Sequence, residues 1–75
     1  MIFFTTSNYI VLTSNRIIQV AYTTKEINFI DRYVDLIGVT KSLRLGSTNF
    51  IMHFDTRADE EFMCDHRDEL IDTLS

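Results

Sequence analysis

The sequence contains no proline, no tryptophan, two glycines and one cysteine, Cys64. A single cysteine excludes an internal disulfide, and a reducing compartment is the simpler expectation, so we predict a cytoplasmic protein. Without proline, the edges of any sheet must be protected by bulges, charges or a covering helix. No charge-free apolar run approaches the ~20 residues of a membrane-spanning helix. We therefore expect any membrane contact to be peripheral.

Positive charge is also scarce, with seven Lys and Arg against eleven Asp and Glu, and the formal net charge is −4 at pH 7. Nucleic-acid binding depends on neutralising phosphates, so this balance predicts no nucleic-acid partner. It also argues against strong, non-specific attachment to an anionic membrane. One small basic pocket remains compatible with it.

Seventy-five residues, 45% of them hydrophobic, are enough for a single domain, residues 1–75, with a core of its own. Most of the chain consists of short segments rich in β-branched and aromatic residues, which favour strands. Their regular spacing predicts an antiparallel sandwich or barrel. The segments are residues 2–5, 9–13, 16–22, 26–30, 36–43, 49–55 and 60–64.

One hairpin is predicted with particular clarity. Asn15, which tolerates a positive φ, ends a two-residue turn that leads into the strand 16–22. Alternation along this strand predicts that Ile18, Val20 and Tyr22 face inward.

The later segments carry further local signals. Gly38 is expected to mark a bulge or a close backbone approach, and Gly46 lies in the turn that closes the next hairpin. Val34 is expected to anchor the connection between two strands. Apolar side chains alternate in two of the strands, which predicts a shared face for Ile27 and Phe29 and another for Phe50, Met52 and Phe54.

Only the end of the chain has helical periodicity. Asp65 is a good N-cap residue, because its carboxylate accepts hydrogen bonds from the free amides of a first helical turn. We predict a helix over residues 66–74. Leu70, Ile71 and Leu74 share one face of it, which we expect to lie over the sheet.

This order of elements resembles the pleckstrin-homology (PH-like) superfamily, in which a bent antiparallel roll is capped by a C-terminal helix. The resemblance is closest to the tail-homology domain of class I myosins and the PH-like domain of endosomal DnaJ proteins. It implies a mostly β fold with one C-terminal helix: a roll or barrel of six to seven short strands capped by helix 66–74. The segments that carry it are residues 9–13, 16–22, 26–30, 35–40, 49–54 and 62–65.

Two features depart from the family pattern. The tryptophan usual in the C-terminal helix is missing, and the first strand, residues 2–5, is very short. A domain shortened at its N-terminus, with its roll completed by a second chain, is therefore one hypothesis.

Basic residues near strand ends are the candidate anion or lipid site. PH-like domains that bind phosphoinositides commonly use basic residues on the first two strands and their loop, but the matching residues 5–9 carry no positive charge. Lys41 and Arg44 lie near one hairpin and could share an anion, and Lys25 is expected near the open end of the roll. The alternative is that these are solvated surface charges.

No metal site, cofactor or catalytic residue is predicted. His53, Cys64, Asp65 and His66 are chemically able to bind zinc, but their spacing matches no structural zinc pattern. A lone cysteine and histidine are weak grounds for a thiol nucleophile. Cys64 is expected to be a small buried hydrophobe.

Tyr33, beside Arg32 in a connection, is the candidate partner contact. A tyrosine in a loop offers an apolar ring and a polar tip to a protein partner. The alternative, that Tyr33 folds back on the sheet edge, stays equally open.

The resemblance implies a non-catalytic module that binds a protein partner, as an adaptor or scaffold part of a larger protein. We expect docking beside the C-terminal helix, with strand 26–30 or 36–43 as an edge that accepts an added strand. One alternative is a weak anionic-phospholipid (phosphoinositide) targeting module. A second is a small protein that associates with itself.

Overall fold

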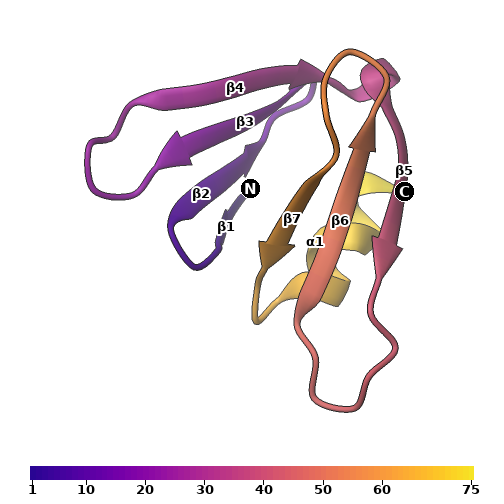
Figure 1. The fold of residues 1–75 in the computed structure, drawn as a ribbon. Coiled ribbons are helices and arrows are strands. Elements are labelled where there is room, and N and C mark those ends of the chain that lie inside the picture. The colour runs from indigo at the N-terminus through magenta and orange to yellow at the C-terminus, as the bar shows by residue number, and fades with distance from the viewer.

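The computed structural model describes all residues from Met1 to Ser75 as seven strands followed by one α-helix (Figure 1). A short 3-10 helix, η1 (Tyr33–Asp35), lies between the fourth and fifth strands. The strands are β1 (Ile2–Phe4), β2 (Asn8–Leu12), β3 (Arg16–Ala21), β4 (Ile27–Arg32), β5 (Leu36–Lys41), β6 (Asn49–Phe54) and β7 (Glu60–Met63), and the helix is α1 (Arg67–Leu74).

The strands form two antiparallel sheets, one in the order β1-β2-β3-β4 and the other in the order β5-β6-β7. The chain passes between them at η1, and the two sheets are steeply inclined to one another (Figure 1). The predicted mostly β fold with one C-terminal helix is confirmed. A closed barrel does not form, because no ladder joins β1 to β7 or β4 to β5. The turn at Thr5–Asn8 instead faces β7 across a cavity.

The core fills the space between the sheets and α1. Its buried apolar side chains are Phe3, Ile10, Leu12, Ile17, Phe50, Met52, Phe54, Phe62, Cys64 and Leu70. The alternation predicted for β6 is confirmed, since its three inward residues are at most 5% exposed. The inward face of α1 is confirmed as well, because Leu70 is fully buried and Ile71 and Leu74 pack against the core.

Strand β3 turns the opposite face inward from the one predicted. Ile17 and Gln19 are buried, whereas Ile18 and Val20 are only half-buried and Tyr22 is exposed. The prediction assigned the apolar residues Ile18, Val20 and Tyr22 to the inward face and therefore placed the polar Gln19 on the solvent side. It was wrong.

Register and a buried hydrogen bond explain the reversal. Ile17 lies opposite Leu12 and Gln19 opposite Ile10, and paired residues in a sheet share a face. The Gln19 amide Nε2 donates to Glu60 at 2.8 Å, which satisfies a polar group that would otherwise be costly to bury.

Two other local predictions are wrong. Val34 is 73% exposed and does not anchor the connection, and Tyr33 packs against the core in its place. The β2–β3 hairpin forms as predicted without a positive φ at Asn15, and the one non-glycine residue with a positive φ is Lys25, at 62°. A bulge shifts the register of β4, so Phe29 pairs with the inward Gln19 and Ile27 with the outward Val20. These two side chains therefore belong to opposite faces.

The helix begins at Arg67, and the predicted Asp65 cap does not form, because no side chain caps this helix. The Arg67 guanidinium instead donates to the carbonyl oxygens of Ser42 and Asn49, at 3.1 and 2.9 Å. These bonds tie the start of α1 to the β5–β6 hairpin. The bulge expected at Gly38 is confirmed by a register shift there, and Gly46 has a φ of 78° in the turn.

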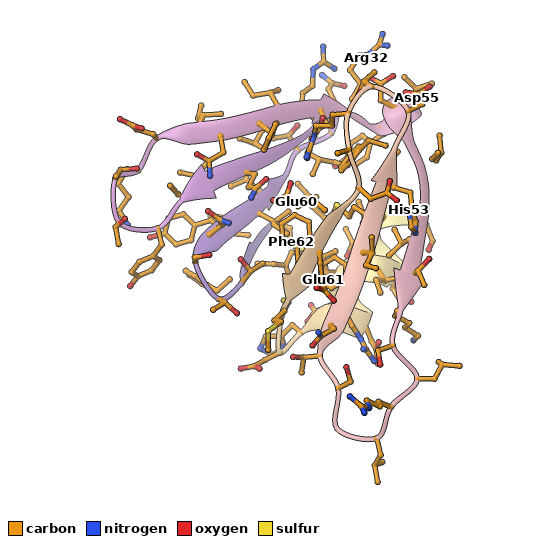
Figure 2. The ribbon with its side chains drawn as sticks, in the orientation of Figure 1. Arg32, His53, Asp55, Glu60, Glu61 and Phe62 are labelled. Atoms are coloured by element: carbon orange, nitrogen blue, oxygen red, sulfur yellow. The ribbon has the colours of Figure 1, made fainter.

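A half-buried guanidinium links the two sheets. Arg57, in the β6–β7 loop, donates to both carboxylate oxygens of Asp31 on β4, at 3.1 and 2.9 Å, and to Glu60 on β7 at 2.7 Å. Its guanidinium carbon lies 3.8 Å from the ring centroid of Phe29 and 4.1 Å from that of Phe54. Glu60 and Phe62 project from β7 into the space between the sheets (Figure 2).

This cluster sets one guanidinium against two carboxylates. Burial alone would lower the pKa of Arg57, but its hydrogen bonds to Asp31 and Glu60 outweigh burial and raise the pKa. The second oxygen of Glu60 accepts from Gln19, so the network runs continuously from β3 to β4. The Gln19 carbonyl oxygen is buried without a hydrogen-bond partner.

The inward face of α1 is tested by Leu70→Ala. The substitution removes the most deeply buried helical side chain, so we expect the free energy of unfolding to fall by about 2–5 kcal/mol in a urea titration. Leu45→Ala, at a fully exposed loop position, is the control and should stay within about 0.5 kcal/mol of the wild type. Equal losses in the two variants would contradict the packing described for α1.

The link between the sheets is tested by Arg57→Met. The change keeps an unbranched apolar stem, removes the guanidinium and leaves two carboxylates unpaired, so we expect a loss of about 2–3 kcal/mol, reduced by the partial exposure of Glu60. Adding Asp31→Asn and Glu60→Gln should restore part of the loss, because no unpaired charge then remains. An Arg57→Met protein as stable as the wild type would rule out the guanidinium as the link.

Candidate functional site

An open apolar groove of about 300 Å³ runs between strand β5 and helix α1. We call it the β5–α1 groove. Five of its seven lining residues are hydrophobic, and they come from one end of β5 and from the last turn of α1. The lining residues are Leu36, Ile37, Gly38, Val39, Ile71, Leu74 and Ser75.

Strand β5 has a free edge beside this groove. It pairs only with β6, and Ser42 donates its amide to the carbonyl oxygen of Asn49 directly opposite. Hydrogen-bonded and non-bonded pairs alternate in an antiparallel ladder, so Val39 and Lys41 fall at non-bonded positions. Their N–H and C=O groups therefore point away from β6 and are available to another strand.

The polar border of the groove is acidic. Positions 68, 71, 72 and 75 lie on one side of a helix, so Asp68 and Asp72 flank the groove-lining Ile71 and Ser75. Asp68 is paired with Lys41 at 3.1 Å and with Arg67 at 3.3 Å, while the Asp72 side chain has no ion pair. The groove thus combines unpaired backbone groups, an apolar floor and one unpaired carboxylate, Asp72.

The three residues predicted as an anion site do not converge. Lys25 lies in the turn between β3 and β4, whereas Lys41 and Arg44 belong to the β5–β6 hairpin at the far end of the other sheet (Figure 1). The Lys25 ammonium sits 4.7 and 4.5 Å from the ring centroids of Tyr9 and Tyr22.

The hairpin cations do not form a shared site either. Lys41 is held by Asp68, and Arg44 makes no ion pair. Anion binding at these residues stays a prediction. At Lys41, an added anion would have to compete with the Asp68 carboxylate, which already pairs with the ammonium.

Arg32 and Tyr33, predicted as a partner contact, lie at the corner where β4 leads into η1. Arg32 is exposed and donates to both oxygens of Asp35, at 2.9 and 3.0 Å. Asp55 lies at the same corner (Figure 2). Tyr33 packs back on the core, which was the alternative prediction, and its hydroxyl donates to the carbonyl of Thr13. A partner contact at Arg32 stays a prediction.

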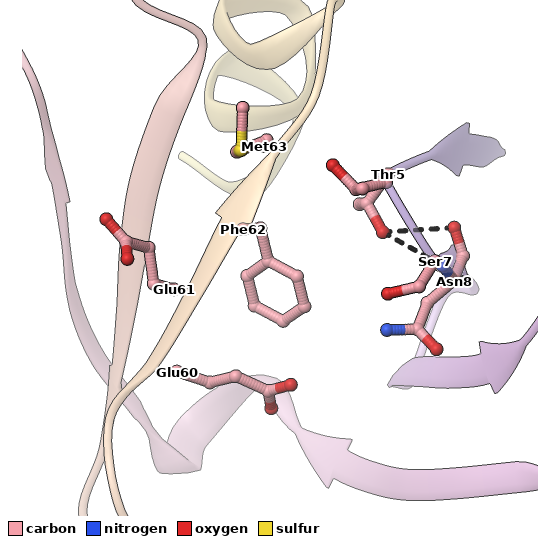
Figure 3. A pocket seen from close by; sticks show the side chains of 8 residues that line it. Thr5, Ser7, Asn8, Glu60, Glu61, Phe62 and Met63 are labelled. Carbon is pink, nitrogen blue, oxygen red and sulfur yellow. Dashed lines mark hydrogen bonds between the residues drawn. The ribbon is translucent and has the colours of Figure 1, made fainter.

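A second cavity, of about 290 Å³, separates the β1–β2 turn from β7 (Figure 3). This turn is where the resemblance would place a phosphoinositide, and it supplies only hydroxyl and amide groups. Across the cavity, Glu60 and Phe62 point toward the turn, while Glu61 points away (Figure 3). A carboxylate facing an uncharged turn does not favour a phosphate.

The residues considered for zinc are not brought together. No three His, Cys, Asp or Glu side chains are close enough to hold a metal ion. Cys64 is 2% exposed, which confirms the buried hydrophobe predicted for it, and burial raises the pKa of its thiol. The thiol is therefore protonated at neutral pH and is not prepared for ligation or nucleophilic attack.

One polar relay was not foreseen from the sequence. His53 contacts the Thr40 hydroxyl through Nε2 at 2.7 Å and Asp59 through Nδ1 at 2.8 Å. A hydroxyl, an imidazole and a carboxylate in this order are the parts of a nucleophilic triad. Here Thr40 is exposed and the Asp59 side chain is 56% exposed, so water surrounds the group on the open face of the sheet. Its evident role is to hold the β6–β7 loop against β5.

The single helix, eight residues long, is too short and too polar to cross a membrane. Comparisons of the chain with protein-family models, with curated proteins and with solved structures gave no match. A functional proposal therefore depends on the fold and on the geometry of the β5–α1 groove.

The Lys41–Asp68 pair predicts a pH dependence. The hydrogen bond from Lys41, followed by its charge, lowers the pKa of Asp68 below the ordinary value of 3.8. A carboxylate with a lowered pKa in the folded state adds stability above its unfolded pKa and loses it as the pH falls through the folded pKa.

We therefore expect Asp68→Asn to be slightly less stable than the wild type at neutral pH, with a difference that disappears as the pH falls below 3.8 in urea titrations. In Lys41→Ala, the NMR-measured pKa of Asp68 should rise toward its ordinary value. An unchanged Asp68 pKa in that variant would show that the pair does not persist in solution.

Proposed function

We propose that this protein is a non-catalytic, PH-like interaction module that binds an extended segment of a protein partner in the β5–α1 groove. Seven antiparallel strands followed by a C-terminal helix occur in the order that the PH-like resemblance implies. The observation that carries the proposal is the free edge of β5 beside an apolar groove.

The mode of binding follows from the groove. A partner segment in β conformation would pair with the outward backbone groups of Val39 and Lys41, which gives affinity independent of sequence. Every second side chain would face α1 and enter the apolar space beside Ile71 and Leu74. A basic residue two positions from this apolar residue would lie on the same face of the peptide and meet Asp72. The preferred ligand is therefore an extended peptide with an apolar residue and a Lys or Arg two positions away.

Both strands predicted as open edges, β4 and β5, do lie at sheet edges. We favour β5, because α1 lies beside it and supplies a wall for ligand side chains, whereas no helix accompanies β4 (Figure 1). As part of a larger protein, such a module would act as an adaptor or scaffold. The lipid-targeting alternative has less support, since its three cations lie apart and two of them are engaged by Tyr9, Tyr22 and Asp68.

The proposal is tested by selecting random peptides, displayed on phage, on the immobilised domain. Selected peptides should share an apolar residue and a basic residue two positions away. They should shift the NMR amide resonances of residues 36–41 and 71–75. N-methylation along a selected peptide should abolish binding at every second position, because only alternate amides face β5.

Ile37→Glu, which places a charge at an exposed position in the groove, should weaken peptide binding by about tenfold or more in calorimetric titrations. Leu45→Glu adds the same charge on a distant exposed loop and should leave binding unchanged. Peptides that shift only resonances outside the groove, or an N-methyl scan without a two-residue period, would count against the proposed mode.

A further inference from the structure

The four-stranded sheet carries an unusual distribution of polarity. Its inward side includes the buried polar residues Gln19 and Asp31. Its solvent side is built from two rows that cross every strand. One row is Ile2, Val11, Ile18 and Ile30, and the other is Phe4, Tyr9, Val20 and Ile27. We call these eight side chains the outer face.

No charged residue interrupts the outer face. Charged residues lie only at the two ends of the face. At one end of β3, Arg16 lies opposite Arg32 on the neighbouring strand, and at the other end the Lys25 ammonium lies over the rings of Tyr9 and Tyr22. Antiparallel sheets usually place polar side chains on the side that faces water, so a solvent side made of aliphatic and aromatic residues needs an explanation.

The size of the outer face matches a protein interface. Ile2, Phe4, Ile27 and Ile30 are each more than half exposed, and so is the adjoining Tyr22. With the half-buried members of the two rows, they present roughly 700 Å² of surface, above the ~300–600 Å² of the largest apolar patch on a typical monomer. A standard interface buries about 800 Å² on each partner.

We propose that the outer face is the contact surface of a homodimer, in which two copies of this chain stack their four-stranded sheets face to face. A two-fold interface requires a patch that is complementary to itself, and an uncharged face of branched aliphatic side chains meets this condition. Two such faces pack about 10 Å apart, as the sheets of a β-sandwich do.

Salt dependence distinguishes a second copy from an anionic bilayer as the occupant. The chain carries a net charge of −4, so an anionic surface and a second copy both repel it, but only a second copy offers an identical apolar face whose burial offsets the repulsion. In the dimer, the rim cations of the two copies repel each other weakly, and salt screens this repulsion while it strengthens apolar burial. Association should therefore become tighter as salt is added, whereas binding to anionic lipid would become weaker.

The test is sedimentation equilibrium of the full chain over a range of concentrations up to about 100 μM. The wild type should show a monomer–dimer equilibrium. Ile18→Lys, at the centre of one row, and Ile30→Lys, at an exposed position on the edge strand β4, should each weaken the dimer by at least about tenfold. Leu43→Lys places the same charge on the exposed β5–β6 loop and should leave the dimer unchanged.

Circular dichroism checks that each variant is folded, and Ile30→Lys carries the test if Ile18→Lys does not fold, because Ile30 is already 57% exposed. A wild type that sediments as a monomer throughout would overturn the proposal. So would a dimer that Ile30→Lys does not weaken, or a monomer that binds phosphatidylserine vesicles through this face. The outer face and the β5–α1 groove belong to different sheets, so peptide binding and dimerisation can fail independently.

Discussion

The arrangement of this fold depends on one guanidinium. Arg57 stands between aromatic rings from the two sheets and donates to a carboxylate on each of them. No backbone ladder connects the sheets, so their relative placement rests on this contact, on the apolar core and on helix α1. An arginine can do this where a lysine cannot, because its planar group stacks between rings while its fork of donors reaches two partners.

The sequence predicted those parts of the fold that depend on local periodicity. The strands, the inward face of β6 and the inward face of α1 follow from alternation or helical spacing, and all were found. The inward face of β3 was predicted wrongly, because Gln19 is buried by a hydrogen bond to Glu60, 41 positions further along the chain. The Arg57 cluster and the His53 relay are likewise made by residues that only the register brings together.

In the candidate site, too, local sequence predicted some features and only the register of the strands determined the others. Docking beside the C-terminal helix was expected from the resemblance, but the groove there and its free backbone groups required the register of β5 with β6. The predicted cations were identified from charge alone, and they are spread over both sheets. Amino-acid composition alone therefore indicated neither of the two proposed contact surfaces. The β5–α1 groove lies at the edge of one sheet, and the outer face lies on the solvent side of the other.

The apolar character of both sides of the four-stranded sheet has a consequence for how the chain reaches its native state. If apolar area alone decided, the sheet would gain by turning its aliphatic rows toward the interior, and two opposite ways of packing it would compete. Asp31 and Gln19 exclude the wrong one, since only in the native orientation can they reach Arg57 and Glu60. These few polar contacts thus stabilise one orientation of the sheet over the flipped one. The fold is made unique by residues that a purely apolar interior would not contain.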